Sequence, residues 1–173
     1  MTLSAIRDAL TRVPEAEQRR AVALVLEAKR KRQTVFFIGN GGSAAIASHM
    51  AADFLKNGGM AAQCFNDGPL MSCLANDLGY WQVFAKPLSA FGKHDDVLFA
   101  ISSSGESSSI KEGIGAAKLN GLHVITLSGF APDNAVRQQG DVNFYVESDQ
   151  YGVVEVCHHA ICHSILDAIN AGG

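Results

Sequence analysis

The 173-residue sequence predicts an α/β fold, a doubly wound parallel sheet of five strands flanked by helices. Five short apolar runs alternate with segments of helical length, which is the pattern of parallel strands joined by helices. Three of these runs are almost continuously apolar, as expected for strands covered on both faces. The composition, 47% apolar and 18% charged, is typical of a globular protein. The expected strands span residues 34–38, 60–65, 96–101, 122–127 and 141–146.

Two helices are expected ahead of the first strand. The spacing of Leu3, Ile6 and Leu10 predicts the first, and Pro14 suits the first turn of a second that runs to about Arg32. The second helix carries an apolar stripe that suits packing against another subunit. We therefore expect residues 1–33 to form an N-terminal helical extension used in oligomer packing and residues 34–173 to form the main domain. The stripe consists of Ala21, Leu24, Val25 and Ala28.

Further helices are expected between and after the strands. In open sheets of this kind, ligands bind outside the carboxyl ends of the strands. The residues that directly follow each strand therefore carry most of the information about function. The expected helices lie near residues 43–56, 69–90, 107–120, 132–139 and 151–170.

The loop after the first expected strand, Gly39-Asn40-Gly41-Gly42-Ser43, is rich in glycine and opens a helix. Glycine lets a ligand approach the backbone closely, and the N–H groups at a helix start attract anions. An ordinary strand-to-helix turn explains the same residues. The segment also fits the dinucleotide pattern G-x-G-x-x-A, but no acidic residue matches the position about 20 residues later that this pattern requires. We expect no nucleotide or redox cofactor.

The loop after the third expected strand is rich in hydroxyl groups. It reads Ser102-Ser103-Ser104-Gly105-Glu106-Ser107-Ser108-Ser109. Serine hydroxyls donate hydrogen bonds to phosphate oxygens, and the following helix start adds N–H groups. A serine-rich turn with Ser107 as a helix cap is the simpler alternative. Two such loops in one parallel sheet favour a phosphate site. Asn76 and Asp77 suit sugar hydroxyls, although both are also common at helix ends.

Two expected helices carry histidines and carboxylates. His49 and Asp53 share one helix face at i, i+4 spacing. In the last helix, Glu155, His159 and His163 share a broad face at 100° per residue, whereas His158 points elsewhere. These residues suit a site for zinc or a similar divalent metal with either His159 or His163 inward, and they equally suit acid–base catalysis without a metal.

Charge and cysteine content exclude several classes of partner and location. The net charge of −3 disfavours nucleic acid or an anionic membrane as a partner, since both require a basic surface. No apolar run approaches the ~20 residues that span a bilayer, and the first residues lack the pattern of a secretion signal. The four cysteines show no C-x-x-C spacing, which predicts free thiols in a reducing cytoplasm.

Five motifs together resemble the sugar isomerase (SIS) domain of the phosphoheptose isomerases. In order they are GNGGSAAIASHMAADF, LANDLGY, DVLFAISSSGESSSI, HVITLSG and VVEVCHHAICHSIL, and the resemblance runs from about residue 34 to 170. It implies an isomerase that interconverts sedoheptulose 7-phosphate and D-glycero-D-manno-heptose 7-phosphate through an enediol, for bacterial surface-heptose biosynthesis. It also implies homotetramers with sites at subunit interfaces, and an active-site zinc in some members.

The resemblance also implies roles for particular residues. Asp53 would be the catalytic base and His163 the acid. Asp53 stands where the best-known members have Glu, and Glu155 where they have Gln, so the base is shorter and the site carries added negative charge. The departure at residue 53 motivates the alternative of a non-catalytic phosphosugar sensor or protein-binding tetramer. Implied substrate contacts are Asn40, Gly41, Gly42, Asp53, Asn76, Asp77, Ser102, Ser103, Ser104, Ser107 and Glu155; implied metal ligands are His49, Asp53, Glu155 and His163.

Overall fold

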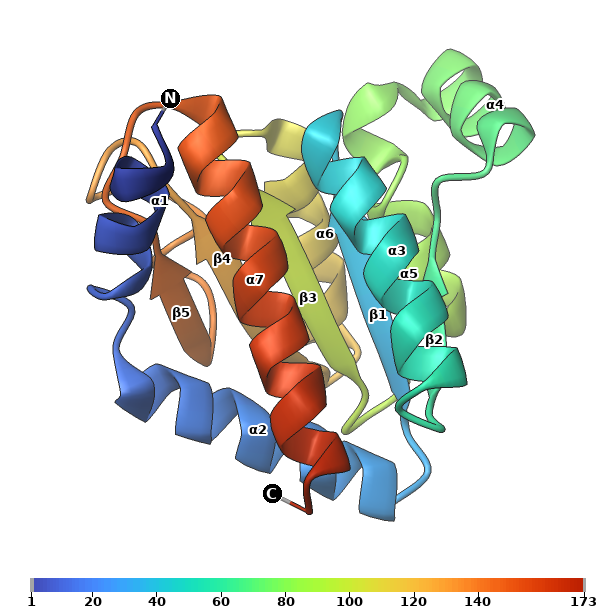
Figure 1. The fold of residues 1–173 in the computed structure, drawn as a ribbon. Coiled ribbons are helices and arrows are strands. Elements are labelled where there is room, and N and C mark those ends of the chain that lie inside the picture. The colour runs from blue at the N-terminus through green and yellow to red at the C-terminus, as the bar shows by residue number, and fades with distance from the viewer. Residues whose placement is uncertain (1, 173) are drawn as a thin grey trace.

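The computed structural model describes residues 2–172, which form one five-stranded parallel sheet with helices on both faces (Figure 1). The strand order is β2-β1-β3-β4-β5, and each strand pairs in parallel with its neighbours. The predicted α/β class and the five parallel strands are confirmed. The strands are β1 (Thr34–Gly39), β2 (Ala61–Cys64), β3 (Val97–Ser102), β4 (His123–Ser128) and β5 (Val142–Tyr145).

One face of the sheet is covered by α1 (Leu3–Leu10), α2 (Glu15–Arg30), α3 (Gly42–Lys56) and α7 (Tyr151–Asn170). Phe37 and Phe99 stack on this face at a centroid distance of 4.7 Å, and both side chains are fully buried. Burial of such a side chain contributes roughly 1.5–3 kcal/mol, so this layer stabilises the position of α3 and α7. Figure 1 shows α3 and α7 side by side in front of the sheet.

The other face is covered by α4 (Gly68–Leu78), the short helix η1 (Tyr80–Gln82), α5 (Ala85–Phe91) and α6 (Ser108–Leu119). Alternate residues of the strands point to the two faces, so Phe36 packs here while Phe37 packs on the opposite side. Helix α4 contributes no buried residue and projects from the body of the molecule (Figure 1).

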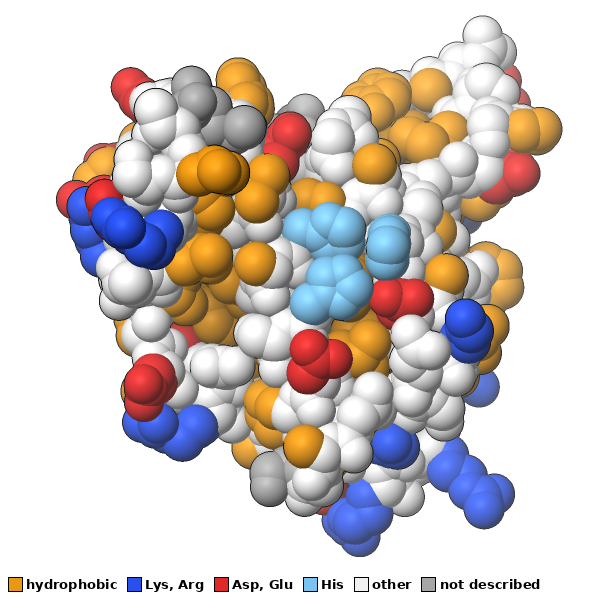
Figure 2. Space-filling view, viewed as in Figure 1, with side chains coloured by type: hydrophobic (Ala, Val, Ile, Leu, Met, Phe, Trp, Pro, Cys, Tyr) orange, Lys and Arg blue, Asp and Glu red, His pale blue; other side chains and the backbone are white. Residues whose placement is uncertain are grey.

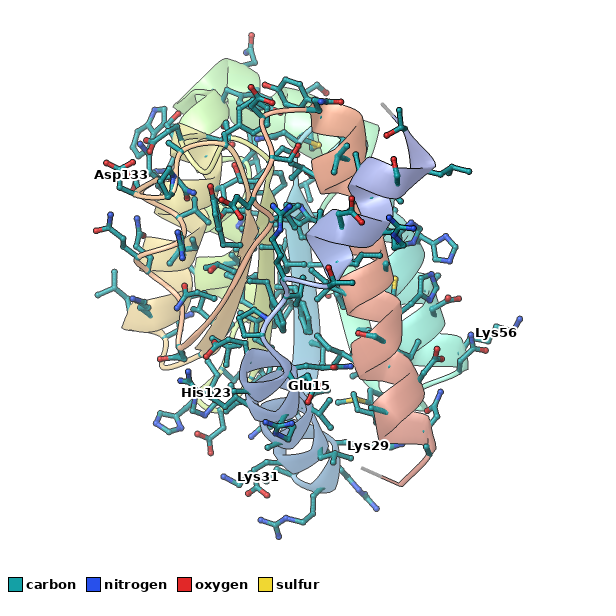
Figure 3. All side chains as sticks on the ribbon, turned by 60° about the vertical axis from the view of Figure 1, so that its left-hand side comes forward. Glu15, Lys29, Lys31, Lys56, His123 and Asp133 are labelled. Atoms are coloured by element: carbon teal, nitrogen blue, oxygen red, sulfur yellow. The ribbon has the colours of Figure 1, made fainter. Side chains whose placement is uncertain are left out.

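The apolar stripe of α2 packs on the core of its own chain. Ala21, Val25 and Ala28 are at most 2% exposed, and α2 contacts α7 and the sheet. Lys29 and Lys31, at the end of this helix, lie at the periphery, as does Lys56 at the end of α3 (Figure 3). Within residues 2–172, no helix has both the length and the apolar character needed to cross a bilayer.

Two expected helices are wrong in detail. The helix expected near 69–90 is broken into α4, η1 and α5, because Gly79 adopts a φ of +91° and ends α4. The segment 132–139 forms turns rather than a helix. There the side-chain amide of Asn134 donates to the carbonyls of Gly129 and Ala131, which stabilises a looped backbone.

Candidate functional site

The glycine-rich and serine-rich loops meet at the carboxyl edge of the sheet, because β1 and β3 are neighbours. The Asn40 amide donates hydrogen bonds to Ser107 Oγ and Ser109 Oγ, both at 2.9 Å. Tyr80 in η1 donates its hydroxyl proton to Asn40 Oδ1 at 2.7 Å. Gly41 has a φ of +54°, a conformation that glycine adopts without strain. Asn40 therefore connects both loops with the segment that follows α4.

A pocket of about 170 Å³ lies between these loops and the start of α7. All four serines expected to bind phosphate line it, and the hydroxyl of Ser103 is buried without a hydrogen-bond partner among the described residues. Ser107 precedes the first turn of α6, whose free N–H groups favour an anion. The lining residues are Asn40, Ser43, Ile101, Ser102, Ser103, Ser104, Ser107, Tyr151 and Glu155.

Backbone geometry and a neighbouring loop hold the serine loop in shape. Gly105 has a φ of +68°, and a Cβ atom there would overlap the side-chain amide of Asn134. The Glu106 carboxylate accepts a hydrogen bond from the Ala135 backbone N–H at 2.9 Å and pairs with Lys111 at 3.3 Å. The Ala135 N–H first, and Lys111 second, lower the pKa of Glu106. The serine loop is thus tied to the loop after β4.

Glu155 lies at the pocket rather than among the histidines. A Cβ atom on Gly42 would lie 2.5 Å from both carboxylate oxygens of Glu155, so the carboxylate packs directly on the first residue of α3. A carboxylate is favoured at this position by the partial positive charge of the helix N-terminus. Glu155 is the only charged residue among the pocket-lining residues that the structure describes.

A histidine cluster lies further along α3 and α7. His49, His159 and His163 bring one ring nitrogen each to within 4.8 Å of one another. Asp53 Oδ2 lies 3.1 Å from His49 Nε2 and 4.0 Å from His163 Nδ1. Figure 2 shows histidine side chains gathered on this face over α3 and α7, beside acidic side chains. Asp53 and His163 therefore meet within a single chain.

His159 belongs to this cluster together with His163. Its ring stacks on His163 at 4.8 Å and meets the His49 ring edge-on at 4.8 Å. Burial is the main cause that lowers the pKa of His159; the positive charges of His163 and His49 lower it further, and Asp53 opposes them. The sequence left open whether His159 or His163 points inward. In the structure both rings do, because each packs against His49.

His158 is separate from the cluster, as its position on the helix predicts. Its ring is fully buried, and Nε2 lies 3.1 Å from the Ser128 carbonyl oxygen. Since a carbonyl only accepts, Nε2 carries the proton. Burial lowers the pKa of His158 to about 4. This residue joins α7 to the end of β4.

Asn76 and Asp77 are not brought to either group. Both are exposed on α4, and the Asn76 amide donates to Asp77 Oδ1 at 2.8 Å. Tyr80, which contacts Asn40, was not expected at the site, although it lies in the motif LANDLGY that carries the resemblance. Ser43 and Tyr151, which line the pocket at the starts of α3 and α7, were not expected there either.

Comparisons with known proteins agree with this geometry. The family model described as SIS domain matches residues 2–129. A phosphoheptose isomerase of Thiobacillus denitrificans is 33% identical over 166 residues, which cover 91% of this chain and 83% of the relative. One from Alkalilimnicola ehrlichii is 33% identical, with 94% and 85% covered. The solved phosphoheptose isomerase of Neisseria gonorrhoeae superposes with a TM-score of 0.89 at 29% identity, covering 98% of this chain and 92% of that one.

Proposed function

This chain belongs to the SIS-domain proteins and, among them, to the phosphoheptose isomerase family, and from this membership we propose that it interconverts sedoheptulose 7-phosphate and D-glycero-D-manno-heptose 7-phosphate. One observation carries the proposal: a serine-lined pocket and a carboxylate–imidazole cluster lie along the same pair of helices. His49 follows Gly42 by seven residues, about 10 Å along α3. A seven-carbon sugar with a terminal phosphate has a comparable length.

The serine loop is the proposed phosphate site. Ser102, Ser103, Ser104 and Ser107 offer hydroxyl donors, and the unpaired hydroxyl of Ser103 is available to a ligand. The first turn of α6 adds N–H groups without requiring a lysine or arginine. Asn40 and Glu155 line the pocket together with these serines, and Glu155 packs on Gly42, next to Gly41, which suits contacts of Asn40, Gly41, Gly42 and Glu155 with the sugar hydroxyls.

Asp53 and His163 are the proposed proton-transfer pair. The Asp53 carboxylate removes the proton from C1 of the ketose and returns it to C2, which leaves the aldose. His163 donates a proton to the carbonyl oxygen as the enediol forms and accepts one from the hydroxyl oxygen as the new carbonyl forms. The separation of 4.0 Å between Asp53 Oδ2 and His163 Nδ1 places both groups within reach of two adjacent carbons.

A divalent metal is part of the proposal. The imidazoles of His49, His159 and His163 are donors that zinc prefers, and the unpaired His159 Nε2 is consistent with a ligand yet to be supplied. Zinc, when bound, supplies a Lewis acid to the site.

The proposed assembly is a homotetramer with sites at subunit interfaces. Asn76 and Asp77 support it, because they lie on a projecting helix that has no buried residue in its own chain and so suits a neighbour's site. A cytoplasmic location in surface-heptose biosynthesis is also proposed, and the four free cysteines are consistent with it.

The test is a turnover assay on purified protein. Sedoheptulose 7-phosphate is added with and without zinc, and the aldose product is followed by NMR; sedoheptulose without phosphate is the control substrate. We expect conversion of the phosphorylated ketose and, because the pocket binds phosphate, little or none of the control. Binding of the phosphorylated ketose without turnover in either condition would instead support the non-catalytic sensor.

A further inference from the structure

Three imidazoles converge between α3 and α7, with the Asp53 carboxylate beside two of them and the Glu155 carboxylate apart from them. The ring nitrogens of His49, His159 and His163 form the one group of three or more potential metal donors in residues 2–172 whose atoms all lie within 4.8 Å of one another. Neither Asp53 nor Glu155 belongs to this group. The ligand set implied by the sequence motifs, which includes both carboxylates and omits His159, therefore differs from the arrangement observed.

Asp53 has the position of a supporting partner. His49 Nε2 donates to Asp53 Oδ2 at 3.1 Å, which leaves the other ring nitrogen of His49 with its lone pair. A carboxylate that accepts the second N–H of a ligating histidine orients the ring and raises its basicity. A carboxylate outside the ligand set also keeps its lone pairs free to accept a proton from a substrate carbon.

Glu155 lies at the start of α3 and not in the histidine cluster. It precedes His159 by one helical turn, about 6 Å along α7. Its carboxylate packs on Gly42 at the start of α3, where the helix dipole stabilises it.

His159, rather than Glu155, offers a donor atom of α7 to the histidine cluster. Its Nε2 atom is buried and has no hydrogen-bond partner among the described residues, an arrangement that costs free energy unless a ligand satisfies the nitrogen. We propose that this chain binds one divalent metal of the zinc class through one ring nitrogen each of His49, His159 and His163, with Asp53 as the outer partner of His49 and Glu155 outside the set. The second ring nitrogen of His163 then keeps the N–H that donates the proton to the substrate. The inference deepens the proposed function and rests on it for the use of the metal in catalysis, but binding is measured without substrate.

The test is a titration of chelator-treated protein with CoCl₂, followed by visible absorption, and then displacement of the cobalt by ZnCl₂. We expect wild type to bind one equivalent and His159→Gln to bind at least about 100-fold more weakly, because loss of a supporting partner alone typically costs 10–100-fold. Glu155→Gln and His94→Ala are expected to bind within about threefold of wild type; His94 is an exposed histidine outside the cluster. The cobalt affinity of Asp53→Asn should fall less than that of His159→Gln.

Two results would overturn the inference. The first is a wild type that binds no cobalt. The second is a His159→Gln variant that keeps its affinity while Glu155→Gln or Asp53→Asn loses it. A circular dichroism spectrum of each variant, together with His159→Ala as a second truncation, separates loss of a ligand from loss of fold. Turnover by the chelator-treated wild type is assayed separately, so failure of the metal proposal and failure of the isomerase proposal give different results.

Discussion

Asp53 is the residue on which the proposed chemistry depends most. Its side chain is 23% exposed and lies between two histidines of different helices, so it is held in place and still reachable by a substrate. The resemblance to the phosphoheptose isomerases implies a Glu at this position, and Asp is one methylene shorter. The packing of α7 brings His163 Nδ1 to 4.0 Å from Asp53 Oδ2.

We expect Asp53→Asn to lower kcat by about 10²–10⁴-fold, the usual contribution of a general base. Amide and carboxylate have nearly the same shape, so binding of the sugar phosphate should change little. Steady-state kinetics and calorimetric binding measure the two effects. Asp167→Asn, an exposed change on α7, is the matched control and should leave kcat unaltered. Undiminished turnover by Asp53→Asn would remove the carboxylate from its assigned role.

His158 makes the stability of the fold depend on pH. Its folded-state pKa is about 4, against an ordinary value of 6.5, because the buried ring disfavours charge. Between these values the unfolded chain binds the proton more readily, so this contribution to stability is complete above about pH 6.5 and is lost as pH falls toward 4, by about 3 kcal/mol in all.

Urea unfolding at several pH values checks this expectation. His158→Gln keeps an N–H donor for the Ser128 carbonyl and removes the titrating group. The unfolding free energy of this variant should fall less than that of wild type between pH 6.5 and 4. Parallel profiles for the two proteins would show that His158 does not titrate as assigned.

The serine loop that lines the pocket could be predicted from the sequence, whereas the rest of the pocket and the histidine cluster could be predicted only in part. Ser102 ends β3 and Ser107 lies in the loop that follows it, and parallel topology alone places such residues at one edge of the sheet. Glu155 and His159 share a helix face, so helical periodicity cannot tell which faces His49. The choice is made by the packing of α3 on α7, which sets Glu155 against Gly42 and His159 against His49.

At the scale of elements, the serine loop depends on one glycine. We expect Gly105→Ala to destabilise the protein by about 1–3 kcal/mol, because its φ of +68° is strained for alanine and the new Cβ would displace Asn134. Since Gly105 lies within the serine loop, strain at this position should also shift the neighbouring hydroxyl groups, and KM for the sugar phosphate should rise.

Gly115→Ala is the control for this glycine substitution. Gly115 lies on the exposed side of α6, and a Cβ there meets no atom within 4 Å. Alanine in a helix interior is favoured over glycine by roughly 0.5–1 kcal/mol, so this variant should gain stability. Urea unfolding gives the free energy of unfolding of both variants. Equal values for Gly105→Ala and Gly115→Ala would show that the serine loop does not require glycine at residue 105.

The helices and strands could be predicted where the pattern of apolar residues is strong. They could not be predicted where a single residue determines the path of the backbone. All five strands were expected within a few residues of their observed bounds, because buried parallel strands leave continuous apolar runs. The break at Gly79 and the turns near Asn134 were missed. Both depend on local backbone and side-chain hydrogen bonds, which a periodic pattern of apolar residues does not report.

At the scale of the whole molecule, the topology accounts for the site. The order β2-β1-β3-β4-β5 makes β1 and β3 neighbours, so two loops more than sixty residues apart in sequence share hydrogen bonds through Asn40. Packing of α3 beside α7 on one face brings residues near 50 and near 160 together. A net charge of −3 does not oppose an anionic substrate here, because the proposed phosphate site offers hydroxyl and N–H donors and does not depend on net charge.

In the proposed complex, one sugar phosphate spans the serine loop and the histidine cluster. A crystal structure of the Asp53→Asn variant with sedoheptulose 7-phosphate tests this arrangement. We expect phosphate oxygens within hydrogen-bond distance of Ser103 and Ser104, with C1 and C2 beside residue 53 and His163. A phosphate bound away from the serine loop, or a carbonyl carbon remote from α3 and α7 in every subunit of the assembly, would contradict it.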